Sequence, residues 1–213
     1  MSLTVLIDYE SGNLHSAQKA FERMAREADA GTVVVTSDAD VVARADRIVL
    51  PGDGAFPACA AALRGASGVY DALVEAVEAR GRPFLGICVG MQLMADLGCE
   101  YTDTPGLGWV TGAVVPISPD DPTLKVPHMG WNDLHLDASH PVFDGIKNGD
   151  HTYFVHSYHF KVSDPATRLA HVEYGGDVTA VVGTGTMLGM QFHPEKSQDV
   201  GLRMIRNFLT WAP

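Results

Sequence analysis

The chain has 213 residues, 46% of them hydrophobic, which fits one folded domain with a full core and excludes a disordered chain. Lys and Arg total 15 against 26 Asp and Glu, and the resulting formal net charge of -11 disfavours nucleic acid and anionic membranes as partners. Three cysteines do not make a disulfide framework, and we see no signal peptide and no apolar run of membrane-spanning length, so we expect a cytoplasmic protein.

The first half of the chain alternates predicted strands and helices. In order, we expect a strand over 3–8, a helix over 14–28, strands over 33–35 and 47–50, a helix over 69–79 and a strand over 83–87. The strands are continuous apolar runs, which is typical of burial on both faces. This half therefore predicts an α/β fold with an open, doubly wound, mostly parallel sheet.

The second half is richer in strands. They are expected over 109–117, 131–136, 152–162, 169–174, 178–182 and 187–192. The turn at 183–186 joins the last two strands, so this half predicts antiparallel hairpin additions to the parallel sheet. A helix is expected over 91–97, and Ser197 is expected to cap a final helix.

The segment Gly86-Ile87-Cys88-Val89-Gly90 has the form of a nucleophile elbow. A strand precedes Cys88 and a helix follows it, and the flanking glycines let the backbone crowd at the turn. The sulfur would then stand exposed at a helix N-terminus, where unpaired N–H groups favour a thiolate. The alternative interpretation is a buried structural cysteine between two packing glycines.

A base and a carboxylate follow about a hundred residues downstream, in Phe192-His193-Pro194-Glu195. On an extended chain His193 and Glu195 project from the same face, and Pro194 marks a strand end or edge. An imidazole that takes the thiol proton, held by a carboxylate, is what a cysteine nucleophile requires. The alternative is a surface histidine beside a surface glutamate, which the joint occurrence with the elbow disfavours.

These segments resemble the class I, triad-type glutamine amidotransferases, and within them the glutaminase subunits of imidazole glycerol phosphate synthase. The similar motifs cover essentially the whole chain, at 8–14, 50–56, 86–92, 127–132, 153–158 and 191–197. The elbow and the His-Pro-Glu segment are shared across the family, whereas the run 127–132 and the Lys196-Ser197 pair are typical of the glutaminase of this synthase. The resemblance implies a flavodoxin-like fold in a single domain, 1–213, and a catalytic triad of Cys88, His193 and Glu195.

The resemblance also implies a set of substrate-binding residues. The loop Gly52-Asp53-Gly54 and the Val89 N–H would form the oxyanion hole, while Gln92 and the backbone at Ser157 and Tyr158 would hold L-glutamine. Taken alone, Gln92 would be a solvated helix residue and the Ser157-Tyr158 pair ordinary strand. Asp53 stands where the family usually has an apolar residue, and we expect it to point outward because a carboxylate would repel the oxyanion.

The partner implied by the resemblance is a (β/α)₈-barrel cyclase, which would use the ammonia to make imidazole glycerol phosphate in histidine biosynthesis. The matching interface positions are Asn13, Trp131, Asn132, Tyr153 and Lys196. From the sequence alone Trp131 would be a core residue. The resemblance implies no cofactor, and we expect no metal because His151, His156 and His159 lack a cysteine or carboxylate at ligand spacing.

Two rival functions remain open. One is a glutaminase of the same class that serves another synthase, such as anthranilate or pyridoxal phosphate synthesis, which the run 127–132 disfavours. The other is a non-catalytic binding subunit or stress-type protein that keeps the elbow cysteine, which the intact His193-Pro194-Glu195 disfavours.

Overall fold

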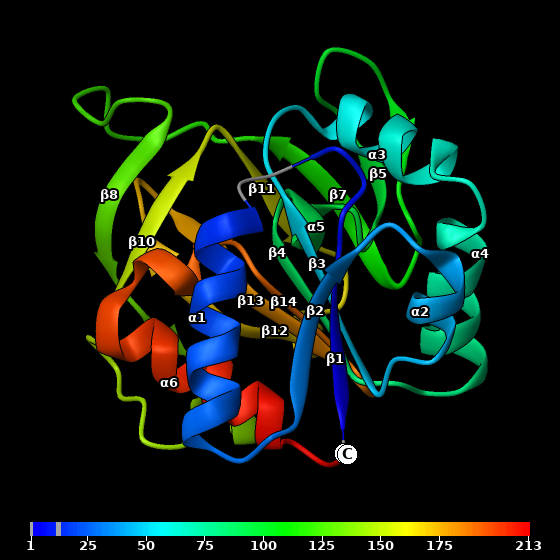
Figure 1. Cartoon of the computed structure of the whole chain (residues 1–213). Helices are drawn as coiled ribbons and strands as arrows, with labels where there is room; N and C mark the ends of the chain where they lie inside the picture. The colour runs from blue at the N-terminus through cyan, green and yellow to red at the C-terminus, as the bar shows by residue number, and fades with distance from the viewer. Residues whose placement is uncertain (1, 12–13) are drawn as a thin grey trace.

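The computed structural model describes residues 2–11 and 14–213. Figure 1 shows its course. Its α-helices are α1 (Leu14–Glu27), α2 (Ala39–Ala43), α3 (Phe56–Gly65), α4 (Val69–Val74), α5 (Val89–Gln92) and α6 (Gln198–Thr210). The π-helical turn η1 (Glu75–Ala79) continues α4, and the 3-10 turns are η2 (Pro141–Phe143), η3 (Pro165–Thr167) and η4 (Pro194–Lys196).

The strands form one large and two small sheets. They are β1 (Leu3–Ile7), β2 (Thr32–Thr36), β3 (Arg47–Gly52), β4 (Phe84–Cys88), β5 (Ala95–Gly98), β6 (Thr104–Pro105), β7 (Val110–Pro116), β8 (His128–Asp133), β9 (His135–Leu136), β10 (His151–His156), β11 (Tyr158–Val162), β12 (Arg168–Glu173), β13 (Asp177–Thr184) and β14 (Met187–Met190).

The large sheet has eight strands in the order β2-β1-β3-β4-β14-β13-β12-β9. The pairs from β2 to β14 are parallel and those from β14 to β9 are antiparallel. Helices α1 and α6 lie together on one side of the parallel strands, with α2, α3 and α4 on the other (Figure 1). The predicted α/β class, mostly parallel sheet and antiparallel additions are thus confirmed.

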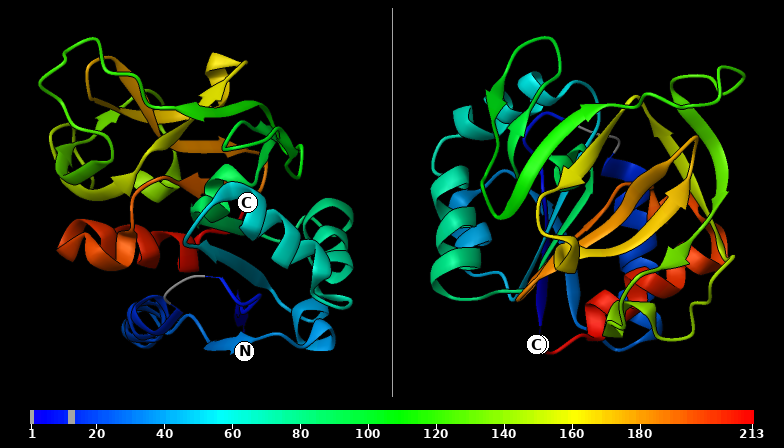
Figure 2. Two further views of the ribbon diagram at one scale, coloured as in Figure 1. Left: turned by 90° about the horizontal axis from the view of Figure 1, so that it is seen from above. Right: turned by 180° about the vertical axis from the view of Figure 1, so that it is seen from behind.

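The two small sheets belong to the second half of the chain. Strands β8 and β10 form an antiparallel ribbon, and β11, β7, β5 and β6 form a four-stranded sheet. Figure 2 (left) shows these green and yellow strands at the top of the view, with α6 beneath them and α1 at the bottom. The predicted strand over 152–162 is wrong as a single element, because the chain leaves one sheet at Ser157 and enters the other as β11.

The predicted helix over 91–97 is also wrong. Helix α5 ends at Gln92, and the carbonyls of Leu93, Met94 and Ala95 accept N–H groups from the segment 107–110 instead of from the next helical turn. Tertiary pairing with this segment overrides the local helical preference, so the chain continues as β5 beside β7.

The core forms where the helices pack against the large sheet. In α6 the side chains of Met204, Ile205, Phe208 and Leu209 recur at helical spacing and are buried with α1 against the sheet. Burying one such side chain contributes about 1.5–3 kcal/mol. Within residues 2–11 and 14–213, no helix combines the length and the apolar character needed to cross a membrane.

Candidate active site

Cys88 sits at a strained turn between β4 and α5. Its backbone has φ 54° and ψ −114°, outside the ordinary regions for a residue with a side chain, a strain of about 1–3 kcal/mol. A Cβ at Gly86 would collide with the backbone of Gly90, and one at Gly90 would collide with the Leu50 carbonyl. The predicted nucleophile elbow is therefore present, and its two glycines are required by close backbone contact.

The Cys88 residue is only 5% exposed, so the prediction of an exposed sulfur is wrong. The residue lines a pocket of 270 Å³ instead. The elbow is covered by β10, β11 and the 52–54 loop. The sequence of the elbow, 86–90, could not predict this cover, because it comes from distant segments. A larger cavity, 850 Å³ between η2 and the end of α6, contains none of the predicted site residues.

His193 and Glu195 lie together beside this sulfur. The Nδ1 of His193 is 2.8 Å from Oε1 of Glu195, and both side chains are buried. The pairing arises from an extended His193 followed by the 3-10 turn η4, and not from a continuous strand as expected. Burial alone would lower the pKa of His193, but its interactions with Cys88 and Glu195 raise it to about 10. The imidazolium therefore persists at neutral pH beside the sulfur.

Ser197 stands at the N-cap position of α6, but the prediction that its side chain caps the helix is wrong. Its hydroxyl donates to the carbonyl of His193 at 2.7 Å and accepts the N–H of Tyr153 at 3.0 Å. The N–H of His193 in turn donates to the carbonyl of Tyr153 at 3.1 Å. Strand β10 is thereby bonded directly to the backbone of the candidate base.

The Gly52–Gly54 loop lies at the end of β3, next to Cys88 on β4. The segment that follows β1 holds one carbonyl of this loop and the carbonyl just before it. The Ser11 hydroxyl donates to the Asp53 carbonyl at 2.9 Å, and the Tyr9 hydroxyl donates to the Pro51 carbonyl at 2.7 Å. The Asp53 residue is exposed, but it also lines the pocket beside Cys88, so the outward direction of its carboxylate stays a prediction. Sequence reasoning missed Tyr9 and Ser11, because the bonds link segments about forty residues apart.

The remaining oxyanion candidate is Val89, the first residue of α5, which lines the pocket. The N–H groups of the first helical turn have no acceptor within the helix, so the Val89 N–H is placed to donate to a ligand. The glycines Gly52 and Gly54 allow the backbone of the facing loop to approach closely.

Gln92 is buried, so the interpretation as a solvated helix residue is wrong. Its Nε2 donates to the carbonyl of Tyr158 at 3.1 Å and to Oε1 of Gln191 at 3.0 Å. Gln191 was not predicted as a site residue, and its own Nε2 points at Sγ of Cys88 from 3.9 Å. Two amides thus link the elbow to the wall of the pocket that carries Ser157 and Tyr158.

Glu100 is a second site residue that the sequence did not indicate. It lines the pocket, and its Oε2 accepts the N–H of Phe56, the first residue of α3, at 2.7 Å. An isolated glutamate outside any recognisable motif carries no local signal, which is why only the tertiary structure identifies Glu100.

Two of the predicted interface residues, Trp131 and Tyr153, lie on the outer face of the β8–β10 ribbon. Trp131 is 47% exposed and packs edge-to-face with its cross-strand neighbour Tyr153, so the core interpretation of Trp131 is wrong. Lys196 is exposed beside the triad. Asn132 belongs to the inner face, where its amide donates to the carbonyl of Glu173 at 3.0 Å. Asn13 lies outside the described residues.

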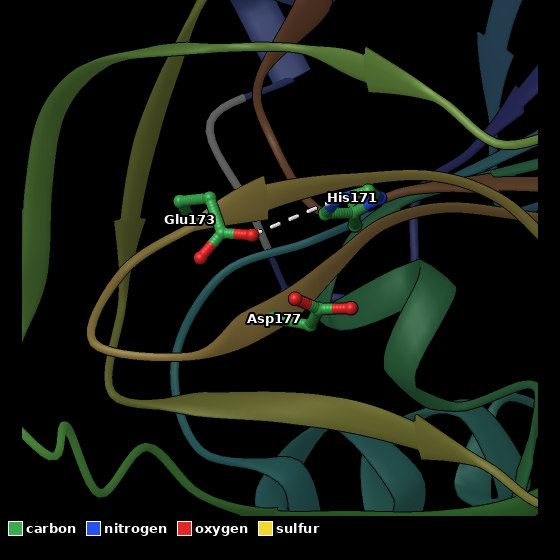
Figure 3. Close-up of side chains that lie close together, drawn as sticks. All are labelled: His171, Glu173 and Asp177. Atoms are coloured by element: carbon green, nitrogen blue, oxygen red, sulfur yellow. Dashed lines mark ion pairs between the residues drawn. The ribbon is translucent and has the colours of Figure 1, made fainter.

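One group in the described part of the chain has metal-ligating side chains close together: His171, Glu173 and Asp177 (Figure 3). Nε2 of His171 is 3.8 Å from Oε1 of Glu173, and Asp177 is bound to the Arg168 guanidinium at 2.9 Å. A cation thus already neutralises Asp177. These residues come from β12 and β13, strands that contribute nothing to the triad.

The family model described as glutamine amidotransferase class-I matches residues 5–211. The protein of Ruegeria pomeroyi named imidazole glycerol phosphate synthase subunit HisH is 75% identical over 99% of this chain and 100% of that protein. The protein of the same name in Cereibacter sphaeroides is 65% identical over the same shares.

Solved structures resemble the chain in fold. A structure described as a glutamine amidotransferase has a TM-score of 0.73 at 21% identity and covers 96% of both chains. The structure of PurLQS from Thermotoga maritima has a TM-score of 0.68 at 18% identity, covering 98% of this chain and 97% of that one. At these identities the likeness supports the fold alone.

Proposed function

The chain belongs to the glutamine amidotransferase class-I family, and from this premise we propose that it hydrolyses L-glutamine to glutamate and ammonia. The observation that carries the proposal is the His193 ring, which contacts Glu195 through Nδ1 and interacts with Cys88. The adjoining pocket of 270 Å³ lies just below the usual range for ligand sites, roughly 300–1,000 Å³, so it suits a ligand as small as an amino acid.

The reaction begins with attack by the Cys88 sulfur on the side-chain carboxamide carbon. The carbonyl electrons move to oxygen, and the N–H of Val89 and those of the 52–54 loop stabilise this oxyanion. His193 transfers its proton to the departing nitrogen, which leaves as ammonia, and a γ-glutamyl thioester remains. His193 then takes a proton from water, the hydroxide displaces the sulfur, and glutamate is released. Glu195 keeps the ring in the orientation that serves both steps.

The α-amino and α-carboxyl groups of glutamine need polar partners in the pocket. One oxygen of Glu100 is used by the Phe56 N–H, and the other is left to pair with the substrate ammonium. Gln92 and the backbone of Ser157 and Tyr158 form the opposite wall. A pocket of this composition would favour an amino acid over a simple amide.

We further propose that the ammonia passes to a (β/α)₈-barrel cyclase subunit of imidazole glycerol phosphate synthase, in the cytoplasm, for histidine biosynthesis. The names of the relatives support this assignment. The exposed pair Trp131 and Tyr153, with Lys196 beside the triad, offers an aromatic anchor and a charge for such a partner. Ammonia must remain unprotonated to react, so a partner that seals the site would prevent its loss to water.

The test is co-expression with the candidate cyclase and measurement of glutamine hydrolysis and product formation by the complex. We expect the chain alone to be nearly inactive and the complex to be active. Cys88→Ala should abolish synthesis from glutamine and leave synthesis from ammonium salts intact. Hydrolysis by the Cys88→Ala complex at the wild-type rate would overturn the mechanism, and a cyclase that gains no glutamine-dependent activity would overturn the partner.

A further inference from the structure

Two buried histidines connect the β8–β10 ribbon to the pocket. Nε2 of His128 lies 3.3 Å from the Asn132 amide nitrogen, and Nδ1 of His128 lies 3.0 Å from Nε2 of His156. Nδ1 of His156 lies 2.8 Å from the carbonyl of Tyr158. The proposed hydrolysis uses neither histidine, yet the row of contacts ends at a residue that lines the pocket.

The chemistry of the end groups fixes the direction of every bond in this row. The Tyr158 carbonyl can only accept, so His156 donates through Nδ1–H. A neutral His156 then accepts at Nε2, so His128 also donates through Nδ1–H and accepts at its own Nε2. The remaining donor is the Asn132 amide, whose oxygen is already bound to the Asp133 N–H. All four groups are satisfied in one arrangement only.

Burial keeps both rings neutral, as this arrangement requires. His128 is 2% exposed and His156 is 6% exposed. Burial lowers the pKa of His128 to about 4 and that of His156 to about 3. The His128 ring is also clamped by stacking on Tyr174 and Phe154, with centroid distances of 4.0 and 4.8 Å. A half-turn flip of either ring would put a carbon atom where a nitrogen now bonds, so it would break the row.

The Tyr158 carbonyl receives a second donor from the elbow side. Gln92 donates to it at 3.1 Å, and Gln92 also holds Gln191, whose amide points at the Cys88 sulfur. This single carbonyl therefore joins the histidine row to the amides beside the nucleophile.

We propose that His128 and His156 are positioning residues for the glutamine site: as neutral Nδ1–H tautomers they fix the Tyr158 carbonyl and so hold the wall of the pocket. The inference rests on the proposed glutaminase function and deepens it. The two histidines lie on the inner face of the ribbon, opposite Met129 and Trp131, which are 62% and 47% exposed. A force applied to the outer face of β8 would reach the pocket through this row.

The test compares two substitutions of His156 in the full chain co-expressed with the candidate cyclase. His156→Asn keeps an N–H donor near the Nδ1 position, whereas His156→Phe removes the donor and keeps a ring. Losing a buried hydrogen bond costs about 1–1.5 kcal/mol, so we expect about a tenfold higher KM for glutamine in His156→Phe. We expect His156→Asn to stay within about threefold of wild type. His151→Asn, on the exposed outer face of the same strand, is the matched control.

A second measurement depends on neither folding of the variants nor turnover. NMR of wild-type protein with ¹⁵N-labelled histidine rings should show His128 and His156 protonated at Nδ1 and unprotonated at Nε2 at neutral pH. An Nε2–H tautomer at either ring would overturn the proposal, as would an unchanged KM in a folded His156→Phe complex. If the wild-type complex hydrolyses no glutamine, the proposed function fails. The positioning proposal is then decided by the tautomers and by the rate at which Cys88 is alkylated, measured on its peptide. His156→Phe should change that rate and His151→Asn should not.

Discussion

Mild acid should destabilise the fold through His156. Burial, reinforced by the nearby rings of His128, His159 and His193 and opposed by the bond to Tyr158, lowers the pKa of His156 from 6.5 to about 3. In the unfolded chain the same ring titrates near 6.5, so below that pH the unfolded state binds a proton that the folded state excludes. A depressed histidine pKa means that its contribution to stability is intact above 6.5 and declines as the pH falls toward 3.

The magnitude follows from linkage. Between pH 6.5 and pH 5.0 the His156 contribution integrates to a loss of about 1.6 kcal/mol in the free energy of unfolding. His128, whose pKa burial lowers to about 4, acts in the same direction. The pKa of His193 is raised to about 10, so its contribution is complete below 6.5 and changes by less than about 0.5 kcal/mol over this interval.

The assay is denaturant unfolding at both pH values for wild type, His156→Asn and the control His151→Asn, provided that each transition is two-state. Wild type and the control should lose more stability on acidification than His156→Asn does, by about 1.6 kcal/mol. Equal losses in wild type and His156→Asn would mean that His156 titrates normally in the folded protein, and the argument from burial would be refuted.

Four further outcomes are expected. Cys88→Ala should lower glutamine hydrolysis by the complex by at least about 10³-fold, since it removes the covalent nucleophile; a smaller loss in a steady-state assay would contradict that role. Glu195→Gln should lower kcat less than Cys88→Ala does, because an orienting carboxylate forms no bond to substrate. Equal losses in kcat would mean that Glu195 does more than orient His193. In calorimetric titration, Trp131→Ala should weaken cyclase binding by about 2 kcal/mol, roughly thirtyfold. Lys161→Ala on β11 is the surface control and should leave the affinity unchanged. An unchanged affinity in Trp131→Ala would mean that the partner binds elsewhere. Ser197→Ala leaves a backbone N–H of β10 without its acceptor, so thermal unfolding should reveal a cost of about 1–3 kcal/mol, and an unchanged midpoint would contradict this bond.

The parts of the site that the sequence predicted are those that local chemistry determines. Gly86 and Gly90 flank Cys88 because neighbouring backbone leaves no room for a Cβ, and that requirement is visible as a spacing. His193 and Glu195 are two residues apart, so their pairing survives even though the chain turns into η4 and not along a strand.

The parts that the sequence did not predict depend on contacts between distant segments. Gln191 reaches the sulfur only because β14 pairs with β4, which places residues about a hundred positions apart side by side. The exposure of Trp131 could not be read from its hydrophobicity, because an aromatic residue on a two-stranded ribbon has one face with no layer above it. The helix over 91–97 was wrong for the same reason, since pairing with 107–110 lies outside any local window.

The two faces of the ribbon explain how a partner could act on an enclosed nucleophile. On β10, Tyr153 presents its ring to the outer face while its backbone exchanges bonds with His193 and Ser197. On the inner face, His128 and His156 reach the Tyr158 carbonyl. Movement of the ribbon would therefore shift the base through one path and the substrate wall through the other. Both paths begin on the same pair of antiparallel strands, so we expect a partner that docks on the outer face to act on the base and on the substrate wall together.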